Sequence, residues 1–331
     1  MILTVTATAV VIALASYTGL SAAVAQRFTT AQRKSPLAGP TDDATACAPP
    51  SAVRFQARDG RASIAAWYQP AAESRGAVVF VHGKDACRGD ELKASTFALA
   101  KAFAEAGLAV LMIDLRGHGH SSGARLTYGE HERFDVLGAV DWLRAQGHRR
   151  IGVLGASMGA AASLMAAADE PAIAALVVDS AFADFGLMIE RQYARLSRLP
   201  GFVLPGALAI ARVLTGVTLQ RVCPLQAAAA LAGRPCLVIH SAGDRFVPAG
   251  DAQALAQAAR GELWITDNDG HIGSYRAGPA AYAARVLGFF RRHLIDEWVP
   301  LRLSARAADT APTTSASACA VSTGQVLACQ T

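Results

Sequence analysis

The chain has 331 residues, of which 52% are hydrophobic, and its formal net charge is +5 at pH 7. A chain of this length and composition can bury one large core and leave residues at both ends, so we expect a single domain. The positive charge is scattered and forms no basic run interleaved with aromatic residues, which argues against nucleic-acid binding.

Residues 1–26 contain no charged side chain and are strongly apolar. About 20 apolar residues cross a bilayer, whereas the apolar part of a signal peptide has about 7–15, so the length favours an uncleaved membrane anchor. The small residues Ala23-Val24-Ala25 leave open a cleaved signal peptide, and with it a secreted or periplasmic protein. The positive-inside rule, applied to Arg27, Arg33 and Lys34, would instead keep the following chain in the cytoplasm, so the side of the membrane stays open.

Residues 27–51 are polar and proline-containing, which is typical of a linker. From 52 to 297, apolar runs alternate with helical patterns, and this alternation predicts a mostly parallel central sheet with helices on both faces. Residues 133–146, for example, place Val136, Val140 and Leu143 on one helical face. Residues 298–331 are rich in Ala, Ser and Thr and are expected to form a disordered tail.

The most informative stretch is Gly155-Ala156-Ser157-Met158-Gly159, which lies between an apolar strand pattern and a helix of small residues. A turn this sharp strains the serine backbone and requires small residues on both sides. It exposes the hydroxyl and directs helical N–H groups toward it. Ser157 is therefore the candidate nucleophile, and a plain helix cap is the alternative.

A serine nucleophile needs a base within hydrogen-bond reach and a third group that orients the base. The apolar run at 237–240 is followed by Asp244, and the run at 263–265 leads to His271 in a polar loop. We expect Asp244 to be the acid and His271 the base. Asp179, which follows the apolar run at 174–178, is the rival acid.

The order Ser157, Asp244, His271 resembles the α/β-hydrolase superfamily, over about residues 52–294. The stretches at 114–121, 178–182 and 224–225 are similar to its serine-aminopeptidase-like and monoacylglycerol-lipase-like branch. This resemblance implies the α/β-hydrolase fold and a serine hydrolase of class EC 3.1.1 that cleaves a carboxylic ester, including lipid or thioester, through an acyl-enzyme. An acyltransferase, a peptidase or a non-catalytic scaffold are the alternatives.

The same turn and a second loop can supply the oxyanion hole. The apolar run at 78–81 ends at His82-Gly83-Lys84-Asp85, so we expect the backbone N–H groups of Met158 and Lys84 to be the donors, with Asp85 replacing Lys84 if the loop is shifted by one residue.

The resemblance also implies a short helical cap after the sixth strand, at about 184–224. Its apolar residues 199–210 could form a lid over an acyl-binding pocket or pack on the core. Arg191, Arg195 and Arg198 recur at helical spacing and could meet anionic lipid head groups or solvent.

No metal or organic cofactor is expected, because the sequence has no C-x-x-C, H-E-x-x-H or G-x-G-x-x-G pattern. We expect four histidines to be structural or solvated: His118, His120, His131 and His148. Six cysteines would suit an oxidising compartment if they pair, although Cys236 opens a core strand and can serve as a buried hydrophobic residue. The expected partners are a small-molecule ester or lipid and the membrane.

Overall fold

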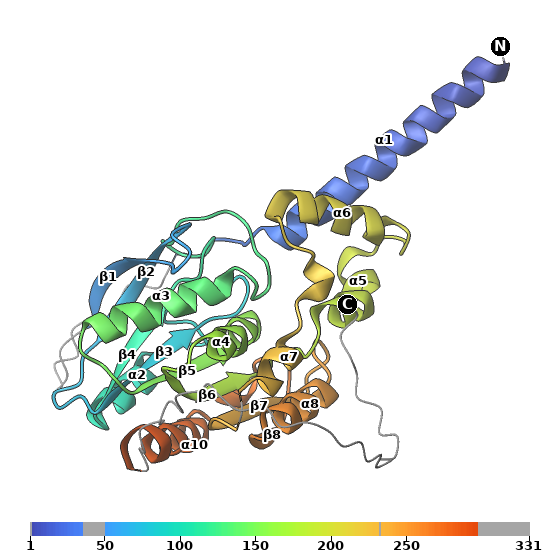
Figure 1. Ribbon diagram of the computed structural model, residues 1–331. Coiled ribbons are helices and arrows are strands. Elements are labelled where there is room, and N and C mark those ends of the chain that lie inside the picture. Colours follow the sequence, from blue (N-terminus) through green and yellow to red (C-terminus); the bar gives the residue numbers. More distant parts are fainter. Residues whose placement is uncertain (1, 36–49, 232, 297–331) are drawn as a thin grey trace, which may run out of the picture.

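The computed structural model describes residues 2–35, 50–231 and 233–296, and its centre is an eight-stranded sheet (Figure 1). The strands are β1 (Ser51–Gln56), β2 (Ser63–Gln69), β3 (Gly76–Val81), β4 (Leu108–Ile113), β5 (Ile151–Ala156), β6 (Ile173–Asp179), β7 (Cys236–Gly243) and β8 (Glu262–Asp269). They are ordered β1-β2-β4-β3-β5-β6-β7-β8. β2 pairs antiparallel with β1 and β4, and all other pairs are parallel, which confirms the mostly parallel sheet.

Helices follow most strands along the chain. They are α1 (Ile2–Thr29), α2 (Phe97–Glu105), α3 (Glu132–Ala145), α4 (Met158–Asp169), α5 (Phe185–Ser197), α6 (Val203–Thr215), α7 (Pro224–Ala229), α8 (Ala249–Ala259), α9 (Ser274–Ala277) and α10 (Pro279–Arg291). A 3-10 turn spans Leu219–Arg221, and a π-helical turn spans Arg292–Asp296.

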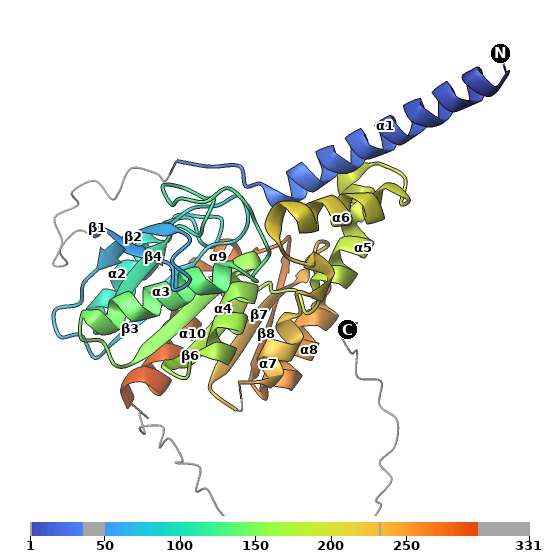
Figure 2. The same ribbon diagram turned by 45° about the horizontal axis from the view of Figure 1, so that its top comes forward.

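The core has two layers because side chains alternate along each buried strand. On β3, Val79 and Val81 face a cluster that includes residues of α3, α4, α7 and α8. Val78 and Phe80 face a second cluster, formed with α2 and α10. Helices therefore cover both faces of the sheet, as Figure 2 shows.

Parallel strands bring the sheet's carboxyl ends to one edge, and the residues that follow β5 to β8 meet there. Ala156 at the end of β5 pairs with Asp179 at the end of β6, and Asp179 pairs in turn with Ile239 of β7. Ser157, Asp244 and His271 each follow one of these strands, so the topology alone places them near one another.

The amino-terminal helix α1 has 28 residues and ends at Thr29, three residues beyond the expected boundary. Its first part projects away from the domain, and its last turns lie against α6 (Figure 1). Val24, Ala25 and Phe28 are buried there. The Tyr128 hydroxyl donates a 2.8 Å hydrogen bond to the Phe28 carbonyl, so the end of α1 is part of the domain core.

The residues just after α1 are also bound to the domain, within the segment that the sequence indicated as a linker. The backbone N–H of Gln32 donates to Asp85 Oδ1 at 2.7 Å. The Arg33 guanidinium donates to the carbonyls of Gly119, Ser121 and Gly123. These contacts fix the start of the linker on the loops after β3 and β4.

Within the described ranges, α1 is the one unbroken helix long and apolar enough to cross a membrane, a property that signal sequences near an amino terminus share.

The described cysteines are in two states. Cys87 and Cys236 are buried free thiols, and Cys223 is disulfide-bonded. Burial raises the pKa of the Cys236 thiol to about 12, as expected for a cysteine that serves as core packing.

Deleting residues 2–29 should destabilise the domain more than deleting residues 2–18. Burying a large apolar side chain contributes about 1.5–3 kcal/mol, and the longer deletion removes both Val24 and Phe28, so we expect a loss of about 3–6 kcal/mol. Urea unfolding of both variants in one detergent measures the difference. Equal unfolding midpoints would show that the end of α1 contributes nothing to the domain.

Candidate active site

Ser157 lies at the sharp turn between β5 and α4, with φ of 51° and ψ of −116°. A positive φ is uncommon for a residue other than glycine and marks local strain. A Cβ at Gly155 would lie 2.7 Å from the Gly159 carbonyl oxygen, and one at Gly159 would lie 2.3 Å from that of His82. Both positions therefore require glycine, as the sequence motif predicts.

A chain of hydrogen bonds joins Ser157, His271 and Asp244. His271 Nε2 lies 2.7 Å from Ser157 Oγ, and His271 Nδ1 lies 2.7 Å from Asp244 Oδ2. Asp244 Oδ1 accepts the backbone N–H groups of Phe246 and Val247 at 2.8 and 3.0 Å. Because an ionised carboxylate only accepts, Nδ1 carries the proton and Nε2 is free to accept from the serine hydroxyl.

The pKa values of the two titrating groups suit this arrangement. Burial lowers the pKa of His271, although the hydrogen bond to Asp244 opposes it, so the imidazole is neutral near pH 7. Burial alone would raise the pKa of Asp244, but the hydrogen bonds from His271 and from two backbone N–H groups hold that pKa below its ordinary value. The site thus pairs a neutral base with an ionised acid.

The rival acid Asp179 has a different set of contacts. Its Oδ1 accepts a 2.9 Å hydrogen bond from Ser180 Oγ, and burial raises its pKa to about 7. Ser180 Oγ in turn accepts the backbone N–H of Ile272 at 3.2 Å. Asp179 therefore contacts the His271 loop through Ser180, and the hydrogen bond to the imidazole comes from Asp244.

The loop after β3 contains Lys84 and Asp85, the two residues expected from the sequence as alternatives for the second oxyanion donor. The backbone N–H of Asp85 donates to His118 Nε2 at 3.2 Å, so it is already occupied. Among the hydrogen bonds of the described residues, none uses the backbone N–H of Lys84 or Met158. A Cβ at Gly83 would lie 3.2 Å from the Ser157 Cβ, which shows how close this loop comes to the serine. The geometry favours Lys84 over Asp85 as the partner of Met158.

Two buried histidines hold this loop, and sequence reasoning missed this use of them. His82 Nδ1 donates to the Gly83 carbonyl at 2.7 Å, and its Nε2 accepts the Leu115 N–H at 3.0 Å. His118 Nδ1 donates to the Arg116 carbonyl at 3.0 Å, which leaves Nε2 to accept from Asp85. Burial lowers the pKa of His82 to about 4 and that of His118 to about 3, so both rings are neutral. The motif around Gly117 and Gly119 is the sequence signal that could have indicated them.

Lys93 is a second residue that the sequence did not single out. Its ammonium donates a 3.2 Å hydrogen bond to the backbone carbonyl of His271. Burial lowers the pKa of Lys93, and the neighbouring Arg276 lowers it further. A cation therefore lies beside the histidine loop.

The motif residues Asp114 and Arg116 have structural contacts. The Asp114 carboxylate accepts the backbone N–H groups of Arg88 and His120 at 2.7 and 2.8 Å. Arg116 forms ion pairs with Asp59 and Asp135. Over the described part of the chain, no group of three or more His, Cys, Asp or Glu residues could hold a metal ion.

The cap region consists of α5, α6 and the 3-10 turn, between β6 and α7. Two of its arginines bind the neighbouring domain surface: Arg191 lies 3.5 Å from Asp251, and Arg195 donates to the Arg245 carbonyl at 3.0 Å. Gln192 donates to the Phe246 carbonyl at 2.8 Å. The α5 helix is thus joined to the loop that carries Asp244. One expectation from the sequence was that Arg191 and Arg195 face only solvent, but both contact the domain.

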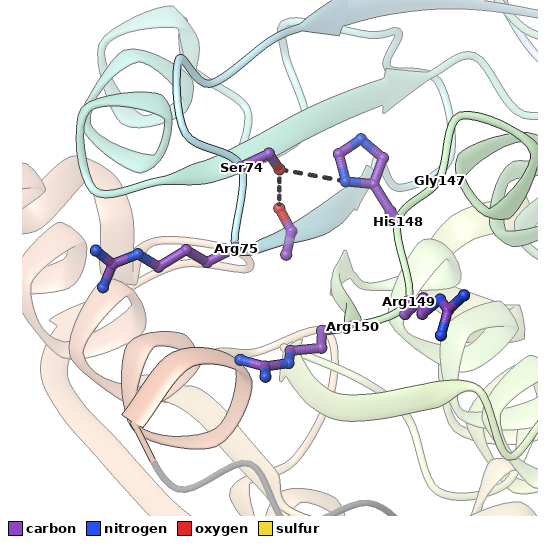
Figure 3. Close-up of a pocket in the computed structure, with 7 residues that line it drawn as sticks. Ser74, Arg75, Gly147, His148, Arg149 and Arg150 are labelled. Carbon is purple, nitrogen blue, oxygen red and sulfur yellow. Dashed lines mark hydrogen bonds between the residues drawn. The ribbon is translucent and has the colours of Figure 1, made fainter.

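A hollow of about 330 Å³ lies at the opposite, amino-terminal edge of the sheet (Figure 3). It contains a second serine–histidine pair, with Ser74 Oγ 3.2 Å from His148 Nδ1. Ser74 donates its hydroxyl proton to the Gly76 carbonyl, and His148 Nε2 lies 2.9 Å from the Tyr68 hydroxyl. Because the Ser74 hydroxyl donates to a carbonyl and not to His148, the imidazole does not act as its base, and we interpret the pair as structural.

Known proteins resemble part of this chain in sequence. Residues 72–222 match the Hydrolase_4 family model, described as serine aminopeptidase, S33. The protein YqkD of Bacillus subtilis is 31% identical over 194 residues, which are 56% of this chain and 63% of YqkD, so the chain spans less than two thirds of that relative.

Solved structures resemble most of the described domain. The Pyrococcus furiosus esterase Pf2001 is similar with a TM-score of 0.65 and 21% identity, over 81% of this chain and 99% of the esterase. The α/β hydrolase GrgF from Penicillium sp. sh18 is similar with a TM-score of 0.59 and 22% identity, over 75% of this chain and 99% of GrgF. At these identities the likeness shows the fold, and the fold expected from the sequence is confirmed.

The lowered pKa of His271 predicts the pH dependence of any reaction in which it acts as base. Protonation removes the base, so kcat/KM for a soluble ester should be level near pH 7 and fall only below about pH 6.5, the ordinary imidazole value. Lys93→Met removes a cation that lowers this pKa and should move the acidic limb upward. Lys101→Met, at a half-exposed position of α2, is the matched control and should not move it. An acidic limb at or above about pH 6.5 in the unmodified protein would contradict the assignment.

Proposed function

We propose that this chain is a serine hydrolase of the α/β-hydrolase superfamily that cleaves a carboxylic ester. The family match, the fold and the hydrogen-bonded Ser157, His271 and Asp244 support this proposal. The observation that carries the proposal is that both 2.7 Å hydrogen bonds are already formed, with Nε2 directed at the serine hydroxyl. Such an alignment needs little rearrangement before attack on an acyl carbon.

In the proposed reaction, Ser157 Oγ attacks the ester carbonyl carbon while His271 Nε2 takes the hydroxyl proton. The N–H groups of Met158 and Lys84 stabilise the resulting oxyanion, and Asp244 stabilises the imidazolium. The intermediate collapses to an acyl-enzyme as His271 gives its proton to the departing alcohol. Water, deprotonated by His271, then attacks the acyl carbon and releases the acid and the free serine.

The main alternative is a peptidase, which the description of the matching family model favours. An aminopeptidase must bind a free α-ammonium group, and Lys93, which contacts the backbone of the His271 loop, is itself a cation. This like charge favours an ester substrate. A panel of p-nitrophenyl esters, monoacylglycerols and aminoacyl p-nitroanilides separates the two, and ester hydrolysis should be the faster. An acyltransferase would instead pass the acyl group to an added alcohol faster than to water.

The proposal includes retention of α1 as a single membrane anchor. Support comes from the burial of Val24, Ala25 and Phe28 in the domain, since a chain cut after Ala25 would lose the first two from that packing. A lipid or other apolar ester is then the favoured substrate, because the enzyme and such a substrate share the membrane.

Ser157→Ala should abolish ester hydrolysis and labelling by a fluorophosphonate probe while the thermal unfolding midpoint stays close to that of the parent. Loss of a triad member lowers turnover by about 10⁴–10⁶. Labelling that survives this change would place the nucleophile elsewhere.

Asp244→Asn should lower kcat by about 10⁴, because an amide can neither hold the same imidazole tautomer nor stabilise the imidazolium. Asp179→Asn is the matched variant and should cost far less, since the raised pKa of Asp179 makes its neutral form common near pH 7 and an amide resembles that form. Steady-state kinetics on one soluble ester compares them, and a larger loss for Asp179→Asn would reverse the assignment.

A further inference from the structure

The cap helix α6 exposes an apolar face. Phe202 at its start, then Pro205, Ala209 and Val213, are exposed and recur every three or four residues, so they share one side of the helix. Val213 is 85% exposed and Phe202 is 66% exposed. α6 contains no acidic residue, and its one charged residue is Arg212. An apolar helix face open to water is costly and marks an interaction site.

The start of α6, next to this face, packs on the end of α1. Tyr17 of α1 stacks on Phe202, with ring centroids 6.3 Å apart. Ser21 Oγ lies 3.5 Å from the Val203 carbonyl oxygen. Gly206 permits the close approach, because a Cβ there would lie 2.5 Å from Ser21 Oγ. Both views show α6 lying against the lower part of α1 (Figures 1 and 2).

The length of α1 sets the height of α6 relative to a bilayer. From Thr4 onward, its exposed large apolar side chains extend from Val5 to Leu20, and Ser21 is the first residue that is buried. The part of α1 from Ile2 to Leu20 has 19 residues, which at about 1.5 Å each extend about 28 Å, close to the roughly 30 Å thickness of the hydrocarbon core. If α1 spans the membrane, the edge of that core lies at the turn where α6 is attached.

We propose that α6 lies on the bilayer that α1 spans, with Phe202, Pro205, Ala209 and Val213 in contact with lipid. This inference rests on the proposed anchor. With 13 residues, or about 20 Å, α6 is too short to cross the membrane and fits an interfacial helix. The occupant is a lipid surface because the exposed face of α6 continues the exposed apolar surface of α1.

Charge at the cap supports an anionic lipid surface. Arg198, which follows the end of α5, and Arg212, in the last turn of α6, are exposed, and neither takes part in a salt bridge among the described residues. Each basic side chain near an anionic surface contributes about 1 kcal/mol of attraction, about a fivefold change in binding. Arg191 and Arg195, which bind Asp251 and the Arg245 carbonyl, are not part of this surface.

The position of the cap connects this surface to the proposed chemistry. Gln192 of α5 binds the Phe246 carbonyl, and the Phe246 ring lies 5.0 Å from the His271 ring. The substrate class that fits is an ester dissolved in the bilayer, which would enter beside α5 and α6 without passing through water.

Quenching of tryptophan fluorescence by brominated lipid tests the placement. The full-length protein is reconstituted in vesicles of phosphatidylcholine and phosphatidylglycerol with or without bromine on the acyl chains. Val213→Trp should add fluorescence that bromine quenches, whereas Leu263→Trp, at a 39% exposed position on edge strand β8, should add fluorescence that it does not. Ile12→Trp, at a 60% exposed position in α1, reports on the anchor itself.

The outcomes separate the two proposals. Quenching at positions 12 and 213 but not at 263 supports both. Quenching at position 12 alone keeps the anchor and overturns the placement of α6 on lipid. A dimer cross-linked through Val213→Cys would also overturn that placement, because a second copy of the chain would then cover this face. No quenching at position 12 overturns the anchor and the inference that rests on it, while hydrolysis of a soluble ester still tests the proposed reaction.

A charge at the same position tests the substrate class. Val213→Glu should lower the ratio of monoacylglycerol hydrolysis in vesicles to p-nitrophenyl acetate hydrolysis by about tenfold, which corresponds to about 1.4 kcal/mol. Leu263→Glu is the matched control and should leave this ratio unchanged. An equal ratio in both variants would show that the α6 face does not deliver the substrate.

Discussion

The strained turn at Ser157 is the constraint on which the rest of the site depends. Gly155 and Gly159 let α4 start directly above β5, within contact distance of the His82 carbonyl, and the serine is held at positive φ between them. At this turn, the loop after β3 and the loop after β8 can both reach the serine. Every other group in the site is placed relative to that fixed hydroxyl: His271 and Asp244 on one side, the Lys84 loop on the other.

Much of this could be predicted from the sequence, because parallel strands bring their carboxyl ends to one edge. Once residues 151–156, 173–179, 236–243 and 262–269 form neighbouring strands, Ser157, Asp244 and His271 must lie near one another. The choice between Lys84 and Asp85 could not be made in this way. It depends on the hydrogen bond from the Asp85 N–H to His118. This bond forms only when two loops, 33 residues apart in the chain, pack against each other.

The amino-terminal segment shows the same limit of prediction from sequence, because its contacts come from distant parts of the chain. Its apolar composition indicated a helix, but composition carries no information on where the helix ends or what covers its last turns. Those turns are buried by Val203, Tyr128 and their neighbours, which lie 100 residues or more along the chain. The small side chain of Gly206, whose importance is visible only beside Tyr17 and Ser21, lets the two helices meet.

Two contacts tie the end of α1 and the residues just after it to both sides of the candidate active site. On one side, the Phe28 carbonyl accepts the Tyr128 hydroxyl, and the Tyr128 ring stacks on that of Phe185 in the cap helix α5, with centroids 3.9 Å apart. On the other, the Gln32 N–H binds Asp85, whose own N–H is fixed by His118 beside Lys84. The helix is thus held by the cap, and the residues that follow it are held by the loop after β3, so tilting α1 would disturb both contacts. An anchored α1 would therefore orient the whole site relative to the membrane, rather than only keep the enzyme near it.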